Sequence, residues 1–124
     1  ANMMKSKFYV CPVCGNVIHA MGDAVIHCHG VLLTPAEFEH PDENHKICIE
    51  IVEDEYYVRV IHEMTKKHYI SFIAAASSDR MQVVKLYPEG NAEARYKING
   101  VRRIYFYCNR DGLFSIDPVR RSDK

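Results

Sequence analysis

The sequence predicts an all-β protein in which a small cysteine-rich unit precedes a larger antiparallel β sandwich or barrel. From about residue 45 onward, apolar stretches of five to eight residues recur between turn-forming residues, which is typical of such folds. No long amphipathic helix is predicted. The region before residue 36 has too little apolar sequence to fold alone, so a metal ion or a partner must add stability.

The first third of the chain is expected to contain three short strands and a polar linker. Strands are predicted over residues 8–10, 17–18 and 25–26, where short apolar groups stand between turn residues. Residues 34–44 are polar and are interpreted as a linker. Thr34-Pro35 could begin a helical turn there, because Thr caps helices and Pro fits the first helical position.

The remainder is predicted to form strands throughout. Ile47, Ile49 and Ile51 alternate with other residues, which indicates a strand with one buried face. Asn99-Gly100 is a strong signal for a two-residue β-hairpin between the strands that flank it. The strands predicted in this part of the chain span residues 46–52, 56–61, 69–75, 81–87, 94–98 and 101–107.

Composition and charge exclude several classes of protein. The chain has 124 residues with 16 basic and 16 acidic side chains, and a net charge of zero argues against a general nucleic-acid binder. No apolar run is long enough to span a membrane, and residues 1–7 lack the apolar core of a signal peptide. We therefore expect a cytoplasmic protein with reduced thiols and with no nucleic-acid or membrane partner.

A first group of potential metal ligands lies in the N-terminal unit. Cys11-Pro-Val-Cys14 is followed by His27-Cys28-His29, so three thiols and one of two imidazoles could form a Cys3His site. Sulfur-rich tetrahedral sites select zinc or iron. The competing interpretation is that Cys11 and Cys14 are a redox pair or unrelated thiols, and the choice between His27 and His29 stays open.

A second group consists of residues at the ends of predicted strands, namely His45, His62, His68 and Cys108. Loops at strand ends commonly carry functional side chains. Taken singly, each histidine would more often be a surface or hydrogen-bonded residue than a metal ligand.

Over nearly the whole chain, a series of motifs resembles those of the desulfoferrodoxin and superoxide reductase family and occurs in the same order. Residues 8–30 are similar to the family's desulforedoxin-like unit with its C-x-x-C-G knuckle. Glu43-Asn44-His45 falls where the family has E-K-H. Three further segments follow family patterns: residues 62–73 (H-x-M-x-x-K-H-Y-I-x-W-I), residues 86–94 (L-K-P-G-x-A-x-E-A) and residues 108–114 (C-N-x-H-G-x-W).

The resemblance implies a rubredoxin- or desulforedoxin-like metal knuckle over residues 1–36 and an immunoglobulin-like β sandwich over residues 37–124. It implies an oxidoreductase that reduces superoxide to hydrogen peroxide at a non-haem iron. An outside electron donor such as rubredoxin would re-reduce the iron. It also implies a homodimer.

Carried over residue by residue, the resemblance assigns most of the iron ligands. Cys108 matches the family's axial thiolate, and His45, His62 and His68 match three of its four equatorial histidines. The fourth position falls on Asp111. Aspartate is anionic and hard, so it would favour ferric iron and lower the reduction potential.

Two residues near the predicted iron site complete the carry-over. Glu43 matches the family's glutamate, and Asn44 replaces the lysine whose charge attracts superoxide. Together with Cys108, these two residues are the predicted catalytic residues. In the small unit, the resemblance gives Cys11, Cys14, Cys28 and His29 as ligands of zinc or iron, with His29 in place of a family cysteine.

These departures keep an alternative function open. The fold could be that of a catalytically weakened desulfoferrodoxin-like protein that binds metal or carries electrons. A third and weaker hypothesis is a zinc-ribbon adaptor that binds protein or nucleic acid, which the neutral charge disfavours.

Overall fold

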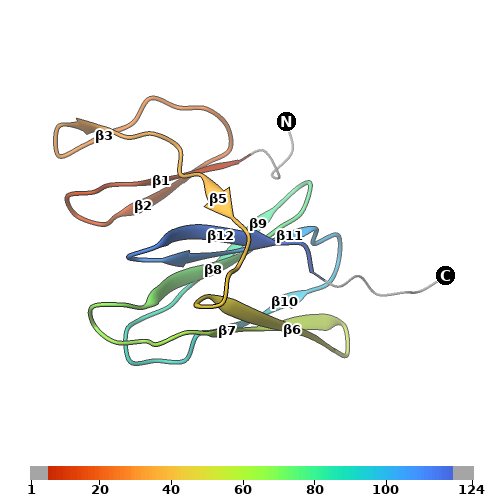
Figure 1. The fold of residues 1–124 in the computed structure, drawn as a ribbon. Coiled ribbons are helices and arrows are strands. Elements are labelled where there is room, and N and C mark those ends of the chain that lie inside the picture. Colours follow the sequence, from red (N-terminus) through yellow and green to blue (C-terminus); the bar gives the residue numbers. More distant parts are fainter. Residues whose placement is uncertain (1–5, 119–124) are drawn as a thin grey trace.

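The computed structural model describes residues 6–118, and this part of the chain contains strands, turns and loops without any helix. A membrane-crossing helix is accordingly absent from residues 6–118. Figure 1 shows three layers: the N-terminal unit packs on a five-stranded sheet, whose other face packs on a three-stranded sheet. The all-β prediction is confirmed.

The N-terminal unit consists of two small antiparallel sheets. Strand β1 (Lys7–Val10) pairs with β2 (Val17–Ala20), and β3 (His27–Cys28) pairs with β4 (Val31–Leu32). Tyr9, Cys11 and Leu33 form its own small core. The sequence placed the third strand two residues too early and did not indicate β4, because strands of two residues are too short to show alternation.

The predicted linker contains one strand and no helical turn. Pro35 forms an isolated β bridge with Tyr9, and the Ala36 N–H donates to the Phe8 carbonyl at 2.7 Å. Strand β5 (Phe38–Glu39) then pairs in parallel with the last strand. The helical turn expected at Thr34-Pro35 is therefore wrong: pairing with β1 keeps this backbone extended.

The sandwich has sheet orders β10-β7-β6 and β5-β12-β11-β8-β9. All pairs except β5–β12 are antiparallel. The strands not yet given are β6 (Lys46–Val52), β7 (Glu55–Ile61), β8 (Ile70–Ala76), β9 (Met81–Lys85), β10 (Glu93–Lys97), β11 (Arg103–Cys108) and β12 (Gly112–Ile116).

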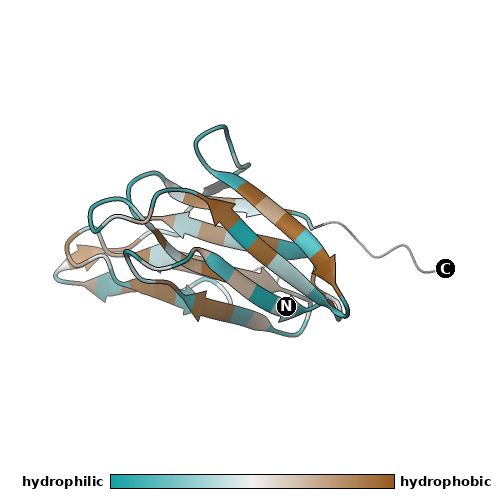
Figure 2. Cartoon of the chain, turned by 90° about the horizontal axis from the view of Figure 1, so that it is seen from below, coloured by the Kyte–Doolittle hydropathy of each residue, from teal (hydrophilic) through white to brown (hydrophobic). Residues whose placement is uncertain are grey.

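Strand β8 is buried on both faces, which explains why its sequence is apolar without alternation. Ile73 and Ala75 point into the core between the two sheets, whereas Phe72 and Ala74 pack with Phe8 of the N-terminal unit. In β7 and β10, by contrast, every second residue is buried, and hydrophobic and hydrophilic bands follow one another along the strands in Figure 2. The middle layer thus joins the N-terminal unit to the sandwich.

The hairpin predicted at Asn99-Gly100 is wrong. The turn exists, with Gly100 at a φ of 72° and the Val101 N–H bonded to the Ile98 carbonyl at 2.9 Å. However, β10 pairs with β7 and β11 pairs with β8, so the turn carries the chain from one sheet to the other. Burying apolar faces of β10 and β11 in one shared core stabilises this crossing.

Candidate metal centres

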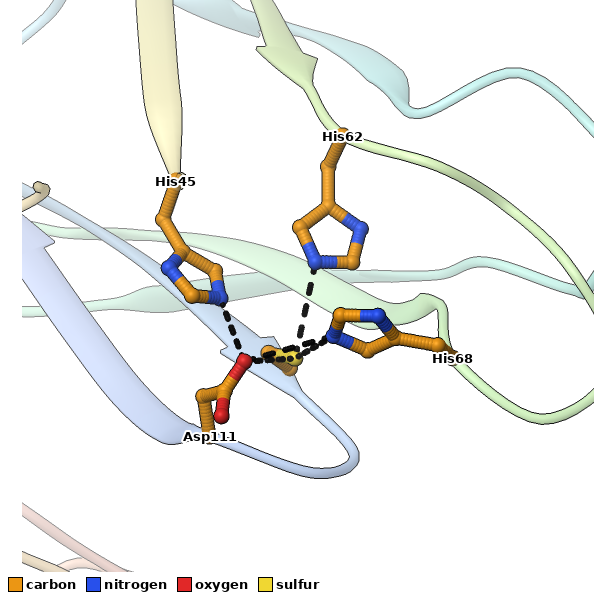
Figure 3. A group of neighbouring side chains, drawn as sticks. His45, His62, His68 and Asp111 are labelled. Atoms are coloured by element: carbon orange, nitrogen blue, oxygen red, sulfur yellow. Dashed lines mark hydrogen bonds and ion pairs between the residues drawn. The ribbon is translucent and has the colours of Figure 1, made fainter. Parts of the chain in front are cut away.

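Five potential ligands meet at one end of the sandwich. His45 directly precedes β6, His62 directly follows β7, and His68 lies in the loop before β8. Cys108 ends β11, and Asp111 lies in the turn before β12. Antiparallel pairing brings these strand termini to the same end of the sandwich, and Figure 3 shows the three rings and Asp111 converging there.

The donor atoms of this main cluster lie at the separations expected around one ion. All five lie within 4.8 Å of one another. The Cys108 sulfur lies 3.2 Å from Nε2 of His68, 3.6 Å from Nε2 of His62 and 3.6 Å from Oδ2 of Asp111. Metal–donor bonds of roughly 2.1–2.4 Å place neighbouring donors about 3.0–3.4 Å apart and opposite donors about 4.2–4.8 Å apart.

The contacts also indicate how the donors are ordered. Asp111 Oδ2 lies beside Nε2 of His45 at 2.9 Å and beside Nε2 of His68 at 3.3 Å. The ring of His62 is close to both other rings, at centroid distances of 5.0 and 4.4 Å, whereas His45 and His68 are 6.4 Å apart. Around the centre of the cluster the donors therefore follow the order His45, His62, His68 and Asp111, and the Cys108 sulfur contacts the last three.

Each histidine has an acceptor at its Nδ1 atom. Nδ1 lies 2.8 Å from Asp42 Oδ1 in His45, 2.6 Å from the Glu63 carbonyl in His62, and 2.6 Å from Glu63 Oε2 in His68. These acceptors assign the ring proton to Nδ1. Every Nε2 lone pair is then directed into the cluster.

The buried Nε2 atom of His45 supplies the test of whether a metal fits. It has no hydrogen-bond donor among the described residues, and it faces the Asp111 carboxylate at 2.9 Å. With the proton on Nδ1, two acceptors face each other, which is unfavourable unless a cation lies between them. The donor set therefore fits a metal ion.

Ionisation in the cluster follows the same logic. Burial lowers the pKa of His62, which keeps its ring neutral, and burial raises the pKa of the Cys108 thiol. Burial would also raise the pKa of Asp111, but its contacts with Cys108, His68 and His45 outweigh burial and lower that pKa. A cation would favour the thiolate form of Cys108.

The knuckle cluster consists of Cys11, Cys14, Cys28 and His29, whose donor atoms also lie within 4.8 Å of one another. The sulfur atoms of Cys14 and Cys28 are 3.7 Å apart, and His29 Nδ1 lies 3.3 Å from the Cys28 sulfur. Tetrahedral zinc with bonds of about 2.3 Å gives a sulfur–sulfur separation of about 3.8 Å. This set can therefore hold a tetrahedral ion.

Backbone conformation explains why His29 and not His27 joins this cluster. His29 and Gly30 have φ values of 53° and 75° and form the two-residue loop between β3 and β4. Such a loop with two positive φ values is a type I′ hairpin turn. It directs His29 toward the cysteines, while His27 pairs with Leu32 in the strand.

Contacts among the thiols oppose their joint ionisation. Contact with the Cys14 backbone lowers the pKa of Cys11, whereas contact with Cys11 raises the pKa of Cys28. One thiolate therefore forms readily and hinders the next. A positive ion is needed to hold three of them together.

Sequence reasoning missed two residues that contact the main cluster. Asp42 and Glu63 accept the Nδ1 protons of His45 and His68, and no motif pointed to either. The only feature of the sequence that could have indicated these two residues is that each lies close to a predicted ligand histidine. The predicted catalytic residues Glu43 and Asn44 are exposed in the turn before His45 and lie outside the five-residue cluster.

The fold and the two clusters define a two-centre β protein with a sandwich and a cysteine-rich knuckle. A search of protein-family models gives no match. A protein named desulfoferrodoxin from Clostridium acetobutylicum is 34% identical over 58 residues, covering 47% of this chain and 46% of the relative. The chain thus matches about half the length of that relative.

A second desulfoferrodoxin and one solved structure cover nearly the whole chain. The desulfoferrodoxin of Desulfarculus baarsii is 28% identical over 115 residues, covering 86% of this chain and 91% of the relative. The crystal structure of the superoxide reductase from Treponema pallidum shares the fold, with a TM-score of 0.78, 21% identity, and coverage of 90% and 98% of the two chains. The chain is thus similar in sequence to two desulfoferrodoxins and in fold to a superoxide reductase, which confirms the resemblance inferred from its motifs.

Proposed function

We propose that the protein is a superoxide reductase-like oxidoreductase that reduces superoxide to hydrogen peroxide at a non-haem iron. One observation carries this proposal: three imidazoles, one thiol and one carboxylate lie within 4.8 Å of one another at the end of the sandwich. Nitrogen, sulfur and oxygen donors together suit a redox-active transition metal. The family relationship supports both iron and an oxidoreductase.

The assigned ligands are His45, His62, His68, Cys108 and Asp111. Bound iron would supply the one electron that each superoxide needs, and two protons complete hydrogen peroxide. A donor protein such as rubredoxin would return the electron. The division into residues 1–36 and 37–124, the cytoplasmic location and the homodimer remain parts of this proposal.

The two faces of the main cluster play different parts in the proposal. Cys108 is fully buried beneath the cluster, which keeps water away from its sulfur. The Asp111 side chain is 46% exposed, so solvent reaches the cluster from that side. We assign superoxide access to the exposed side, away from the thiolate.

Glu43 and Asn44 are the proposed catalytic residues beside Cys108. Both are exposed and adjoin the buried His45 in the chain. The Asn44 side-chain amide can donate a hydrogen bond to an anionic oxygen, and the Glu43 carboxyl can carry a proton between solvent and product. Because Asn44 is neutral, it orients the anion without attracting it over distance.

The knuckle cluster is assigned to zinc or iron. Three thiolates and one imidazole suit either metal, and the imidazole favours zinc as a structural ion. The alternative function as a weakened metal-binding or electron-carrier protein is not favoured by the comparisons.

Iron reconstitution tests the proposal. We expect the iron-loaded chain to consume superoxide with one peroxide formed per superoxide, and to show a thiolate-to-iron charge-transfer band. Cys108→Ser should remove the band and the activity. Cys48→Ser is the matched control, because Cys48 is the one cysteine outside both clusters. A band and an activity that both survive Cys108→Ser would refute the assignment.

A further inference from the structure

We propose that Glu63 and Asp42 are positioning residues that fix His68 and His45 and, through their negative charge, strengthen these imidazoles as donors to the iron. Together with Asp111 they bias the site toward ferric iron. This inference rests on the proposed function, because it requires a metal at the main cluster. It concerns two carboxylates that do not themselves belong to that cluster.

Glu63 holds two ligand rings at once. Its carboxylate lies 2.6 Å from Nδ1 of His68, and its backbone carbonyl lies 2.6 Å from Nδ1 of His62. Both Nε2 atoms are thereby turned toward the Cys108 sulfur, at 3.2 and 3.6 Å. One residue therefore sets the tautomer and the orientation of both rings.

Asp42 sets the tautomer and the orientation of the His45 ring from within a tight turn. Its Oδ1 accepts from Nδ1 of His45 at 2.8 Å and from the Asn44 N–H at 3.0 Å. The buried His45 ring is also stacked on Phe114 with centroids 4.4 Å apart. Packing and the carboxylate together leave this ring one orientation.

The loop that carries Glu63 does not need the Glu63–His68 contact to close. The Thr65 N–H donates to the His68 carbonyl at 3.0 Å, and the His68 N–H donates to Thr65 Oγ1 at 3.0 Å. The Ile70 N–H contacts the Met64 sulfur at 3.3 Å. Because these bonds hold the backbone of the loop, the loop does not depend on the Glu63 carboxylate, whose role is to orient the His68 imidazole.

The three histidines provide an internal comparison. His62 donates Nδ1–H to a neutral carbonyl, whereas His45 and His68 donate to carboxylates. A carboxylate acceptor raises the basicity of the opposite nitrogen, so the carboxylate-bound rings bind a more highly charged ion more tightly. Removing that charge should therefore destabilise ferric iron more than ferrous iron.

The test uses the full chain and two readouts other than activity. The first is the affinity for Co²⁺, taken from the absorption that disappears in Cys108→Ser, so that knuckle-bound cobalt is excluded. The second is the reduction potential of the iron-loaded protein. Loss of outer carboxylates of this kind typically costs about 10- to 100-fold in metal affinity.

We expect Glu63→Ala and Asp42→Ala each to weaken cobalt binding by about 10- to 100-fold. Glu63→Gln keeps an acceptor oxygen and should restore most of the affinity, yet still raise the potential because the charge is gone. A tenfold loss in the preference for ferric over ferrous iron corresponds to about 59 mV. Glu50→Gln removes one negative charge from the exposed part of β6 and should change neither readout.

Unchanged cobalt affinity and potential in the Glu63 and Asp42 variants would overturn this inference while the proposed iron site stands. An equal potential in Glu63→Gln and the unaltered protein would overturn the role of the charge. If the unaltered protein shows no Cys108-dependent cobalt band, the metal site and this inference fall together. The melting temperature of each metal-free variant shows whether it is folded.

Discussion

Asp111 Oδ2 and His45 Nε2 lie 2.9 Å apart, with the His45 proton drawn to the opposite side of the ring by Asp42. An anionic oxygen thus faces a lone pair at the centre of the main cluster. Asp111 also occupies the position where the family pattern has a histidine, so the charge of the ligand set is more negative by one.

Replacing this aspartate should change the electronic balance of the site. We expect Asp111→His to raise the reduction potential of bound iron and the rate of superoxide reduction, because a neutral donor stabilises ferrous iron relative to ferric iron. Potentiometric titration and superoxide consumption measure the two effects. A potential that stays the same or falls would contradict the assignment of Asp111 as a ligand.

Asn44→Lys should accelerate the capture of superoxide. A cation on the exposed turn before His45 would attract the anion, and the increase should shrink as salt is added. The second-order rate constant, measured at low and high ionic strength, tests this. Lys46→Gln removes a positive charge from an exposed side chain at the start of β6 and measures how strongly a charge near the turn changes this rate constant. An Asn44→Lys rate equal to that of the unaltered protein would argue against the turn as the entry side.

The knuckle should depend on its metal while the sandwich does not. Cys14→Ser removes a donor from a unit whose own cluster of buried residues is small, consisting of Tyr9, Cys11 and Leu33. We expect the loss of one metal per chain and faster amide hydrogen exchange in β1–β4, with β8 still protected. Metal content and hydrogen exchange measure this, with Cys48→Ser as control. Unchanged protection in β1–β4 would show that the unit folds without the ion.

His19 should make the protein less stable in acid. Burial lowers the pKa of His19 below its ordinary value of 6.5, so the fold favours the neutral ring. As the pH falls, the unfolded chain takes up a proton on His19 before the folded chain does. The contribution of His19 to the free energy of unfolding is therefore fully present above about pH 6.5 and decreases below it.

His19→Phe should remove this loss. It should also stabilise the protein by on the order of 1 kcal/mol at neutral pH, because His19 Nε2 is buried without a hydrogen-bond partner among the described residues. Urea unfolding at pH 7.5 and pH 5 measures both effects. His40→Phe, at an exposed histidine, is the control. An equal acid sensitivity of His19→Phe and the unaltered protein would exclude His19 as the cause.

Local patterns predicted single strands better than they predicted strand partners. Strands β6 to β11 were expected within a few residues of their actual limits, because alternation and apolar runs are local. Strand β12 (Gly112–Ile116) was not predicted, because it begins with a glycine and its burial does not alternate along the strand. The Asn99-Gly100 turn was predicted correctly, but whether its flanking strands pair depends on the shared core.

The sequence by itself determined that this is an all-β protein with two groups of thiols and imidazoles, because composition, periodicity and motif spacing are properties of the chain. The sequence also determined that Asp111 follows Cys108 by three residues. Only the tertiary structure decided that His29 joins the knuckle instead of His27, and that Asp42 and Glu63 hold the ligand rings. Such contacts depend on turn conformation and on side-chain direction, and neither is fixed until distant strands pack against one another.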